Sequence, residues 1–126
     1  MKVLTSYYDK TPTLDKDAYT FIRVSRKEVP EWFDNDYKHV DMSEFFGPSP
    51  ALLAECHPLE NWTEFEPRYK SEVLSILDKG ATLNKLDTIY TEHGDRPLVL
   101  LCYETSEQNC HRHLIGEYLE IDTTEL

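Results

Sequence analysis

The amino-acid sequence predicts one small α/β domain over residues 1–126, built in three layers around a mostly parallel sheet with helices on both faces. Three observations predict this fold. Residues 97–103 (PLVLLCY) are nearly continuous in apolar side chains, which is typical of a central strand covered on both faces. The predicted segments follow in the order β-β-α-α-α-β-α. A chain of 126 residues has the size of one domain. A mixed sheet is the alternative.

The amino-terminal strands are short and rich in β-branched and aromatic residues. Residues 2–8 predict the first strand, and residues 19–25 (YTFIRVS) predict the second, because β-forming residues alternate there in part. A turn or short helix should follow and bury the large rings of Trp32 and Phe33. Residues 37–42 suit a brief extended segment.

Helix signals dominate the middle of the chain. Ser49 is a suitable N-cap, and Pro50 suits the first helical position. A second helix is expected over residues 67–79, where four apolar side chains share one face, and Gly80 should end it.

Two further helices are expected towards the carboxyl end. One should run from a Thr82 cap to about residue 92 and end at Gly94. The last should begin near Cys110. Its side chains that we expect to be buried are Leu114, Ile115, Tyr118 and Leu119.

The formal net charge is −11, and the acidic residues are spread along the chain. Because phosphate backbones repel such a chain, we expect no DNA or RNA binding. The charge is explained by solubility, or alternatively by docking onto a basic protein partner or by mimicry of nucleic acid. No apolar run approaches the ~20 residues that span a bilayer, and we expect no membrane association. The three cysteines, an odd number with no secretory signal, favour reduced thiols in a cytoplasmic protein.

The predicted functional site is the junction between the apolar strand and the last helix. In open parallel sheets, ligands bind at the carboxyl ends of strands, beside the amino ends of the following helices. Six reactive or charged side chains stand at this junction: Cys102, Glu104, Cys110, His111, Arg112 and His113. The two histidines are two positions apart, so at most one of them points into the site.

Arg112 is the most informative of these residues. The dipole of a helix disfavours a cation near its amino terminus by up to ~1 kcal/mol, so Arg112 requires an anionic partner. That partner is either a ligand, held by the guanidinium and the free N–H groups, or a carboxylate such as Glu104. Cys110 is either a nucleophilic or redox thiol with a lowered pKa, or a small buried residue in a tight turn. Cys102 either joins the ligand-binding residues or packs in the core.

Two amino-terminal segments extend the predicted site. If the strands are parallel neighbours, their carboxyl ends meet at one edge, and the polar residues there would face Cys110 and Arg112. These residues are Ser6, Tyr8, Ser25 and Arg26. For the serines and the tyrosine, turn capping and rim packing are the alternative roles. Trp32 either packs in the core or offers a wall for a ring of the ligand.

Several familiar sites are not expected. The cysteines and histidines include zinc-ligand types, but there is no Cys-x2-Cys pair, and the spacing around Cys102 and Cys110 is unusual for structural zinc. We therefore predict neither a metal nor another cofactor. The four glycines form no phosphate-binding loop, and there is no Gly-x-Ser-x-Gly or Cys-x5-Arg motif.

The carboxyl-terminal motifs LLCYE (100–104) and CHRHL (110–114) resemble the signature of the family named domain of unknown function 488. Further segments resemble a short subgroup of it, namely TSYY (5–8), VSR (24–26), PEWF (30–33) and the helix around residues 69–74. The resemblance covers most of the chain. It implies a compact α/β domain with these motifs at one end of the sheet, and it implies no activity. It also supports a site formed by Cys102, Glu104, Cys110, His111 and Arg112.

The leading functional hypothesis is a domain that binds, and processes or sequesters, a small anionic ligand derived from a nucleotide. Arg112 and Arg26 would bind its phosphate, Glu104 a ribose hydroxyl, and an aromatic ring its base. In an enzyme, Cys110 would be the nucleophile, with His111 or Glu104 as acid and base. The alternative is a non-catalytic acidic interaction module, such as an inhibitor in bacterial or viral defence, with a structural Cys/His cluster.

Overall fold

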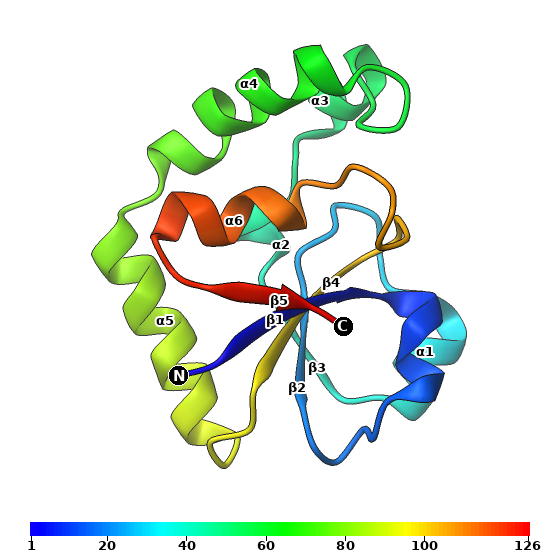
Figure 1. Ribbon diagram of the computed structural model, residues 1–126, viewed down its shortest axis with the longest axis vertical. Coiled ribbons are helices and arrows are strands. Elements are labelled where there is room, and N and C mark those ends of the chain that lie inside the picture. Colours follow the sequence, from blue (N-terminus) through cyan, green and yellow to red (C-terminus); the bar gives the residue numbers. More distant parts are fainter.

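A five-stranded, all-parallel sheet organises the chain (Figure 1), in the strand order β3-β2-β4-β1-β5. The computed structural model describes all residues, 1–126. The strands are β1 (Val3–Tyr7), β2 (Thr20–Arg23), β3 (His39–Asp41), β4 (Leu98–Cys102) and β5 (Thr123–Glu125). The helices are η1 (Tyr8–Thr13) and η2 (Leu74–Ile76), both of the 3-10 type, and α1 (Glu31–Asp36), α2 (Ser43–Phe46), α3 (Pro50–Glu55), α4 (Trp62–Glu72), α5 (Lys79–Glu92) and α6 (Arg112–Leu119). None of these helices is both long and apolar enough to cross a membrane.

Strand β4 lies at the centre of the sheet, as its apolar sequence predicts. All five of its residues are buried, and it pairs with β1 on one side and β2 on the other. Successive side chains of a strand point to opposite faces. Leu98, Leu100 and Cys102 therefore join the larger core, while Val99 and Leu101 join the smaller one.

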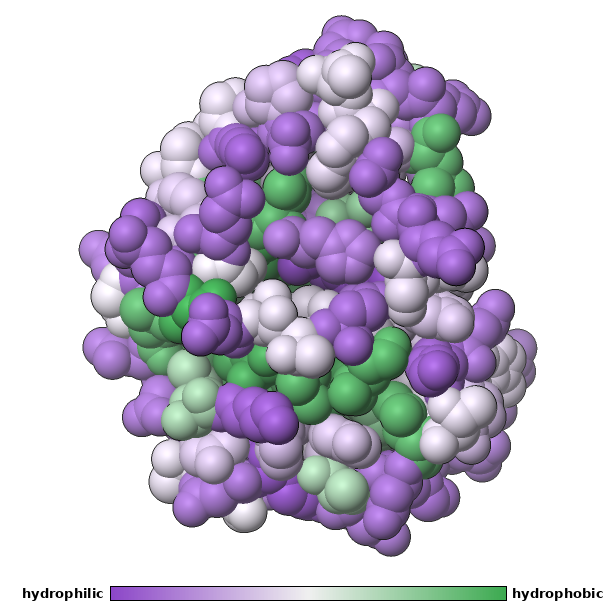
Figure 2. All heavy atoms as spheres, viewed as in Figure 1, coloured by the Kyte–Doolittle hydropathy of each residue, from purple (hydrophilic) through white to green (hydrophobic).

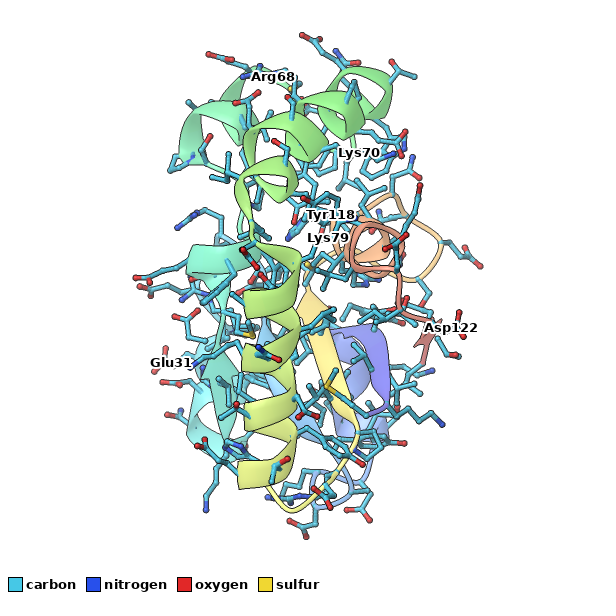
Figure 3. The ribbon with its side chains drawn as sticks, turned by 90° about the vertical axis from the view of Figure 1, so that its left-hand side faces the viewer. Glu31, Arg68, Lys70, Lys79, Tyr118 and Asp122 are labelled. Atoms are coloured by element: carbon cyan, nitrogen blue, oxygen red, sulfur yellow. The ribbon has the colours of Figure 1, made fainter.

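The two cores lie on opposite faces of the sheet and give the three layers. The larger core lies under α2 to α6, and the smaller, mainly aromatic core lies under η1 and α1. Helices α4, α5 and α6 meet near Tyr118, where the Lys79 ammonium lies 4.8 Å from the centre of the tyrosine ring (Figure 3). Polar residues cover much of the face in Figure 2, and apolar residues reach the surface in a band across its middle. The predicted single three-layer α/β domain is confirmed.

Two predicted boundaries of the middle helices are confirmed, since Ser49 caps α3 at Pro50 and α5 ends at Glu92. The other boundaries are wrong. Helix α4 begins at Trp62 rather than Pro67, which lies inside it, and α4 ends at Glu72. Gly80 lies in the first turn of α5, because the side chain of Asp78 accepts a hydrogen bond from the Ala81 N–H at 2.8 Å and starts a new helix there. The apolar stripe that we predicted over residues 67–79 is interrupted, since the chain turns after α4 and leaves Ile76 exposed.

Thr82 and Trp32 also differ from expectation. Thr82 is buried inside α5 and does not cap it. In α1, Phe33 is fully buried against the sheet, whereas Trp32 is 40% exposed. Neighbouring residues in a helix point about 100° apart, as 3.6 residues per turn require, so one short helix on this sheet buries one of the two rings.

Strand β5 was not predicted, because three polar residues (TTE) show no apolar pattern. It pairs with β1 in parallel, and its Glu125 lies beside the start of α6. The close approach of α6 to β5 depends on Gly116. A Cβ atom there would lie 2.7 Å from Cγ2 and 2.8 Å from Oγ1 of Thr123.

Candidate functional site

A hollow of about 280 Å³ lies at the carboxyl edge of the sheet. Strands β2 and β4 end side by side, with Arg23 opposite Leu101, so the loops that follow them meet at this edge (Figure 1). The first loop contributes residues 25–27, and the loop between β4 and α6 contributes Tyr103, Glu104, Gln108 and His111. Pro48, Leu53, His57 and Leu59, in and beside α3, complete the lining. The structure thus places this hollow at the junction where we expected a site.

Below the wall of this hollow, Cys102, Cys110 and His111 form a buried cluster. One sulfur or nitrogen atom from each residue lies within 4.8 Å of the others. Both cysteines are fully buried, and His111 is 4% exposed. The end of β4 positions Cys102, and the chain entering α6 positions the other two residues. The sequence neighbourhood alone did not show that both thiols contact one imidazole.

The imidazole of His111 has a fixed orientation. Its Nε2 lies 2.8 Å from the carbonyl oxygen of Val24, at the end of β2, and donates a hydrogen bond to it. Sγ of Cys102 lies 3.4 Å from the same Nε2 and 3.9 Å from Nδ1, and Sγ of Cys110 lies 3.8 Å from Nδ1. The ring of Tyr69 packs against it at 5.2 Å between centroids. Of the two nearby histidines, His111 therefore points into the cluster, while His113 points towards Glu125.

The electrostatics of the cluster separate its two thiols. Burial raises the pKa of both, and the Cys102 thiol remains well above its usual range. For Cys110, hydrogen bonds from Cys102 and His111 outweigh burial and hold the pKa well below its usual range. Burial lowers the pKa of His111, but the charge of the Cys110 thiolate raises it overall. Burial also raises the pKa of Glu104. A Cys110 thiolate beside an imidazolium is therefore favoured.

Arg112 is fully buried and its guanidinium is already paired. Its Nη2 lies 2.8 Å from Oε2 of Glu125, and its Nε lies 3.2 Å from Oε1 of the same carboxylate. It also donates to the carbonyl oxygens of Glu104 and Thr105. The carboxylate partner is thus Glu125 of β5, and Arg112 fixes the loop of the site to the edge strand instead of presenting free donors to an anion.

The ion pair predicts a specific acid response. Burial would raise the pKa of Glu125, but hydrogen bonds from His113 and Arg112 hold it far below its usual range. A carboxylate whose folded pKa is depressed adds stability above its unfolded pKa, about 4.3, and that contribution is lost as the pH falls towards the folded pKa. We expect Glu125→Gln to be less stable than the wild type near neutral pH, with a difference that shrinks below about pH 4. Urea unfolding of both proteins across this range measures the effect, and a constant difference would contradict it.

The structure separates the four polar residues that we expected at the strand ends. Ser25 and Arg26 line the hollow. Ser6 does not face Cys110, because it shares the sheet face of Leu4, opposite α6, and is buried there without a hydrogen-bond partner. Tyr8 also belongs to the smaller core, and its hydroxyl group lies 2.8 Å from Oγ of Ser25. Tyr8 therefore supports the site from the opposite face of the sheet.

Trp32 is not part of the hollow, and its ring contacts Phe33 and Tyr37 on α1 and the loop after it. Sequence reasoning missed Lys27, which lines the hollow and lies 4.9 Å from the centre of the Tyr103 ring. Its position directly after Ser25 and Arg26 at the end of β2 was the available signal. His57 was also missed, and its contribution from the segment after α3 had no sequence signal.

A larger hollow, of about 390 Å³, lies near the start of β2, and its lining includes Lys16, Asp17, Asp36 and Arg96. In Arg96 the guanidinium is already bonded to the backbone carbonyls of His93 and Asp17. Ligands of parallel α/β sheets bind at the carboxyl ends of the strands. We therefore assign the candidate site to the smaller hollow, which also adjoins the Cys/His cluster.

Comparisons with known proteins identify the family. A protein-family model described as "DUF488-N3a: Active DUF488-N3 subclade" matches residues 5–123. Neither the curated proteins nor the solved structures gave a match. The matched range includes all but the last three residues and the first four, and both halves of the candidate site lie within it. The chain belongs to the DUF488-N3a family.

Proposed function

We propose that this protein binds a small anionic, nucleotide-like ligand in the hollow at the carboxyl edge of the sheet. The charge of the lining is the observation that supports this most directly. Arg26 and Lys27 stand there against a single acidic residue, Glu104, in a chain whose net charge is −11. A local basic lining on an acidic protein attracts an anion to that place.

The other lining residues fit the rest of such a ligand. Leu53, Leu59 and Pro48 offer an apolar wall, and Ser25 and Gln108 offer hydrogen-bonding groups. The volume of about 280 Å³ lies near the lower end of the range for ligand pockets, about 300–1,000 Å³. A nucleoside monophosphate or a sugar phosphate suits this size better than a dinucleotide.

The proposal changes the role of Arg112. Because its guanidinium is paired with Glu125 and with two loop carbonyls, it shapes the wall of the hollow and does not contact the phosphate. Arg26 is partly occupied as well, since it donates to the carbonyl oxygens of Pro48 and Gly47. Lys27 is the most exposed cation of the lining and is the main phosphate contact in our proposal.

Processing of the ligand is the second part of the proposal, and the description of the matched subclade as active supports it. Glu104 and His111 line the hollow, so they would be the acid and base that reach a ligand directly. Cys110 is fully buried beneath them. As a nucleophile it would require the loop of residues 103–109 to open, because a nucleophile must contact the atom that it attacks.

The binding proposal is tested by thermal shift and calorimetric titration against nucleoside monophosphates, nucleoside diphosphates and sugar phosphates. A ligand at a hundredfold excess over its Kd stabilises the folded protein by about 2.7 kcal/mol, which raises the Tm visibly. We expect Lys27→Glu to weaken the binding by about tenfold or more, equivalent to about 1.4 kcal/mol. Lys85→Glu is the matched control, since it makes the same charge change at an exposed position of α5, away from the hollow.

Two results would contradict the proposal. The first is a panel without any stabilising anion. The second is a ligand that binds Lys27→Glu and Lys85→Glu equally well, which would place the binding elsewhere. Either result would favour the acidic protein-interaction module, whose association with a basic partner should fall steeply with salt concentration.

A further inference from the structure

We propose that Cys102, Cys110 and His111 bind a zinc ion. This inference rests on the geometry of the three side chains and is independent of the proposed ligand. Zinc is bound in proteins by thiolate sulfur and imidazole nitrogen, and the cluster offers two sulfurs and one nitrogen within 4.8 Å of one another. Cations that prefer oxygen ligands, such as Mg²⁺ and Ca²⁺, do not suit this donor set.

The separations between Nδ1 of His111 and the two sulfurs are close to those of a tetrahedral site. With Zn–S of about 2.3 Å and Zn–N of about 2.0–2.1 Å, a tetrahedral angle separates sulfur from nitrogen by about 3.6 Å. Nδ1 of His111 lies 3.9 Å from Sγ of Cys102 and 3.8 Å from Sγ of Cys110. Sγ of Cys102 lies nearer to Nε2, at 3.4 Å. Zinc binding at Nδ1 therefore requires the side chain of Cys102 to turn towards Nδ1, so that its sulfur joins that of Cys110 around one ion.

The other ring nitrogen of His111 is held as in known metal sites. A metal-bound histidine usually donates its second N–H group to a carbonyl or carboxylate, which fixes the tautomer and the plane of the ring. Here Nε2 donates to the carbonyl oxygen of Val24 at 2.8 Å, and Tyr69 packs against the ring. This hydrogen bond occupies Nε2, so Nδ1 is the ring nitrogen that would lose its proton and bind the ion.

The unusual sequence spacing follows from the tertiary structure. Structural zinc motifs often place ligands close together within one loop. In this fold, Cys102 ends β4, whereas Cys110 and His111 precede α6, and the loop between them forms the wall of the hollow. The parallel sheet brings the ligands together, so a Cys-x2-Cys pair is unnecessary.

Three protein ligands leave a fourth coordination position, as in catalytic zinc sites. His111 belongs both to the cluster and to the lining of the hollow, and Glu104 stands beside it there. The proposal therefore assigns the fourth position to a water molecule or a ligand oxygen on the side of the hollow. The zinc ion would polarise an oxygen atom bound in the fourth position and would lower the pKa of a water molecule bound there.

The experiment measures the metal content of untagged protein purified from zinc-supplemented cells, by plasma mass spectrometry. We expect one zinc ion per chain in the wild type, and background levels in Cys110→Ser and in His111→Gln. Cys56→Ser is the matched control, because Cys56 is also a buried free cysteine but lies outside the cluster. It should retain the zinc of the wild type. Circular dichroism confirms that each variant is folded.

Cobalt substitution gives a readout that does not depend on the variants. The metal-free, reduced wild type titrated with Co²⁺ should develop thiolate-to-cobalt charge-transfer absorption in the near ultraviolet, and zinc should abolish it. Wild-type protein without zinc and without this absorption would overturn the inference. So would zinc retained by both Cys110→Ser and His111→Gln, or zinc lost from Cys56→Ser. The Lys27→Glu ligand titration is a separate measurement, so failure of one proposal is distinguishable from failure of the other.

Discussion

Replacing Arg112 with methionine is expected to lower the free energy of unfolding by about 3 kcal/mol, the lower end of the range for removing one partner of a buried ion pair. The guanidinium is fully buried, whereas the Glu125 side chain is 22% exposed. Water can therefore solvate part of the unpaired carboxylate, which reduces the loss of stability. Three groups lose a charged donor at once: the Glu125 carboxylate and the carbonyl oxygens of Glu104 and Thr105. Urea unfolding monitored by circular dichroism measures the change.

Two controls separate the ion pair from the loss of a large side chain. Arg68→Met removes an arginine of the same size from a surface pair with Glu55 and Glu72, and it should change the stability much less. The double variant Arg112→Met with Glu125→Leu should recover part of the loss, because no uncompensated carboxylate remains. If Arg112→Met were as stable as the wild type, the guanidinium would not be needed by the fold. The hypothesis that it binds an anionic ligand would then be restored.

The sequence predicted the central part of the fold well, because the physical signals there are local. An uninterrupted apolar run such as PLVLLCY has few uses other than a covered strand, and it forms β4. A parallel sheet then requires its carboxyl edge to hold the loops after β2 and β4. The sequence therefore predicts that four residues from these loops lie near one another: Ser25, Arg26, Glu104 and His111. All four line the hollow.

The parts that sequence reasoning missed depend on contacts between distant segments. Helix α5 starts earlier than predicted because Asp78 caps it, and Asp is a stronger N-cap than Thr82, which lies one turn further along. Strand β5 has three polar residues, and it forms because its backbone pairs with the edge of β1. The partner of Arg112 lies on that strand, so the choice between a ligand and a carboxylate required the structure.

The Cys/His cluster shows the same dependence on tertiary structure. Spacing rules for zinc motifs describe ligands within one loop, and by those rules Cys102 and Cys110 are unpromising. The fold brings both sulfurs to within 4 Å of one imidazole nitrogen, at 3.9 and 3.8 Å. Val24, at the end of a third segment, accepts a hydrogen bond from the other ring nitrogen and so fixes the orientation of the imidazole. No pattern within residues 102–113 contains that information.

Gly116→Val is expected to lower the free energy of unfolding by about 2–3 kcal/mol, as overpacking of a tight interior site does. A Cβ atom would lie 2.7 and 2.8 Å from the Thr123 side chain and 3.1 Å from the carbonyl oxygen of Ile121. Relief requires β5 to move away from α6, and this movement would also pull Glu125 from Arg112. Helix propensity alone slightly favours valine over glycine, so the expected loss of stability comes from the contact with β5. Chemical denaturation of Gly116→Val and the wild type measures the difference in the free energy of unfolding.

A double-mutant cycle with Thr123→Ala tests the cause. The two closest atoms to the added Cβ are Cγ2 and Oγ1 of Thr123, and alanine lacks both. The double variant should therefore recover about 1 kcal/mol or more relative to the sum of the single variants, as contacting residues do. Strict additivity would mean that the helix backbone, and not the contact with β5, bears the cost of valine. In that case α6 would tolerate displacement of β5, and the Arg112–Glu125 pair would contribute less to the site than its burial implies.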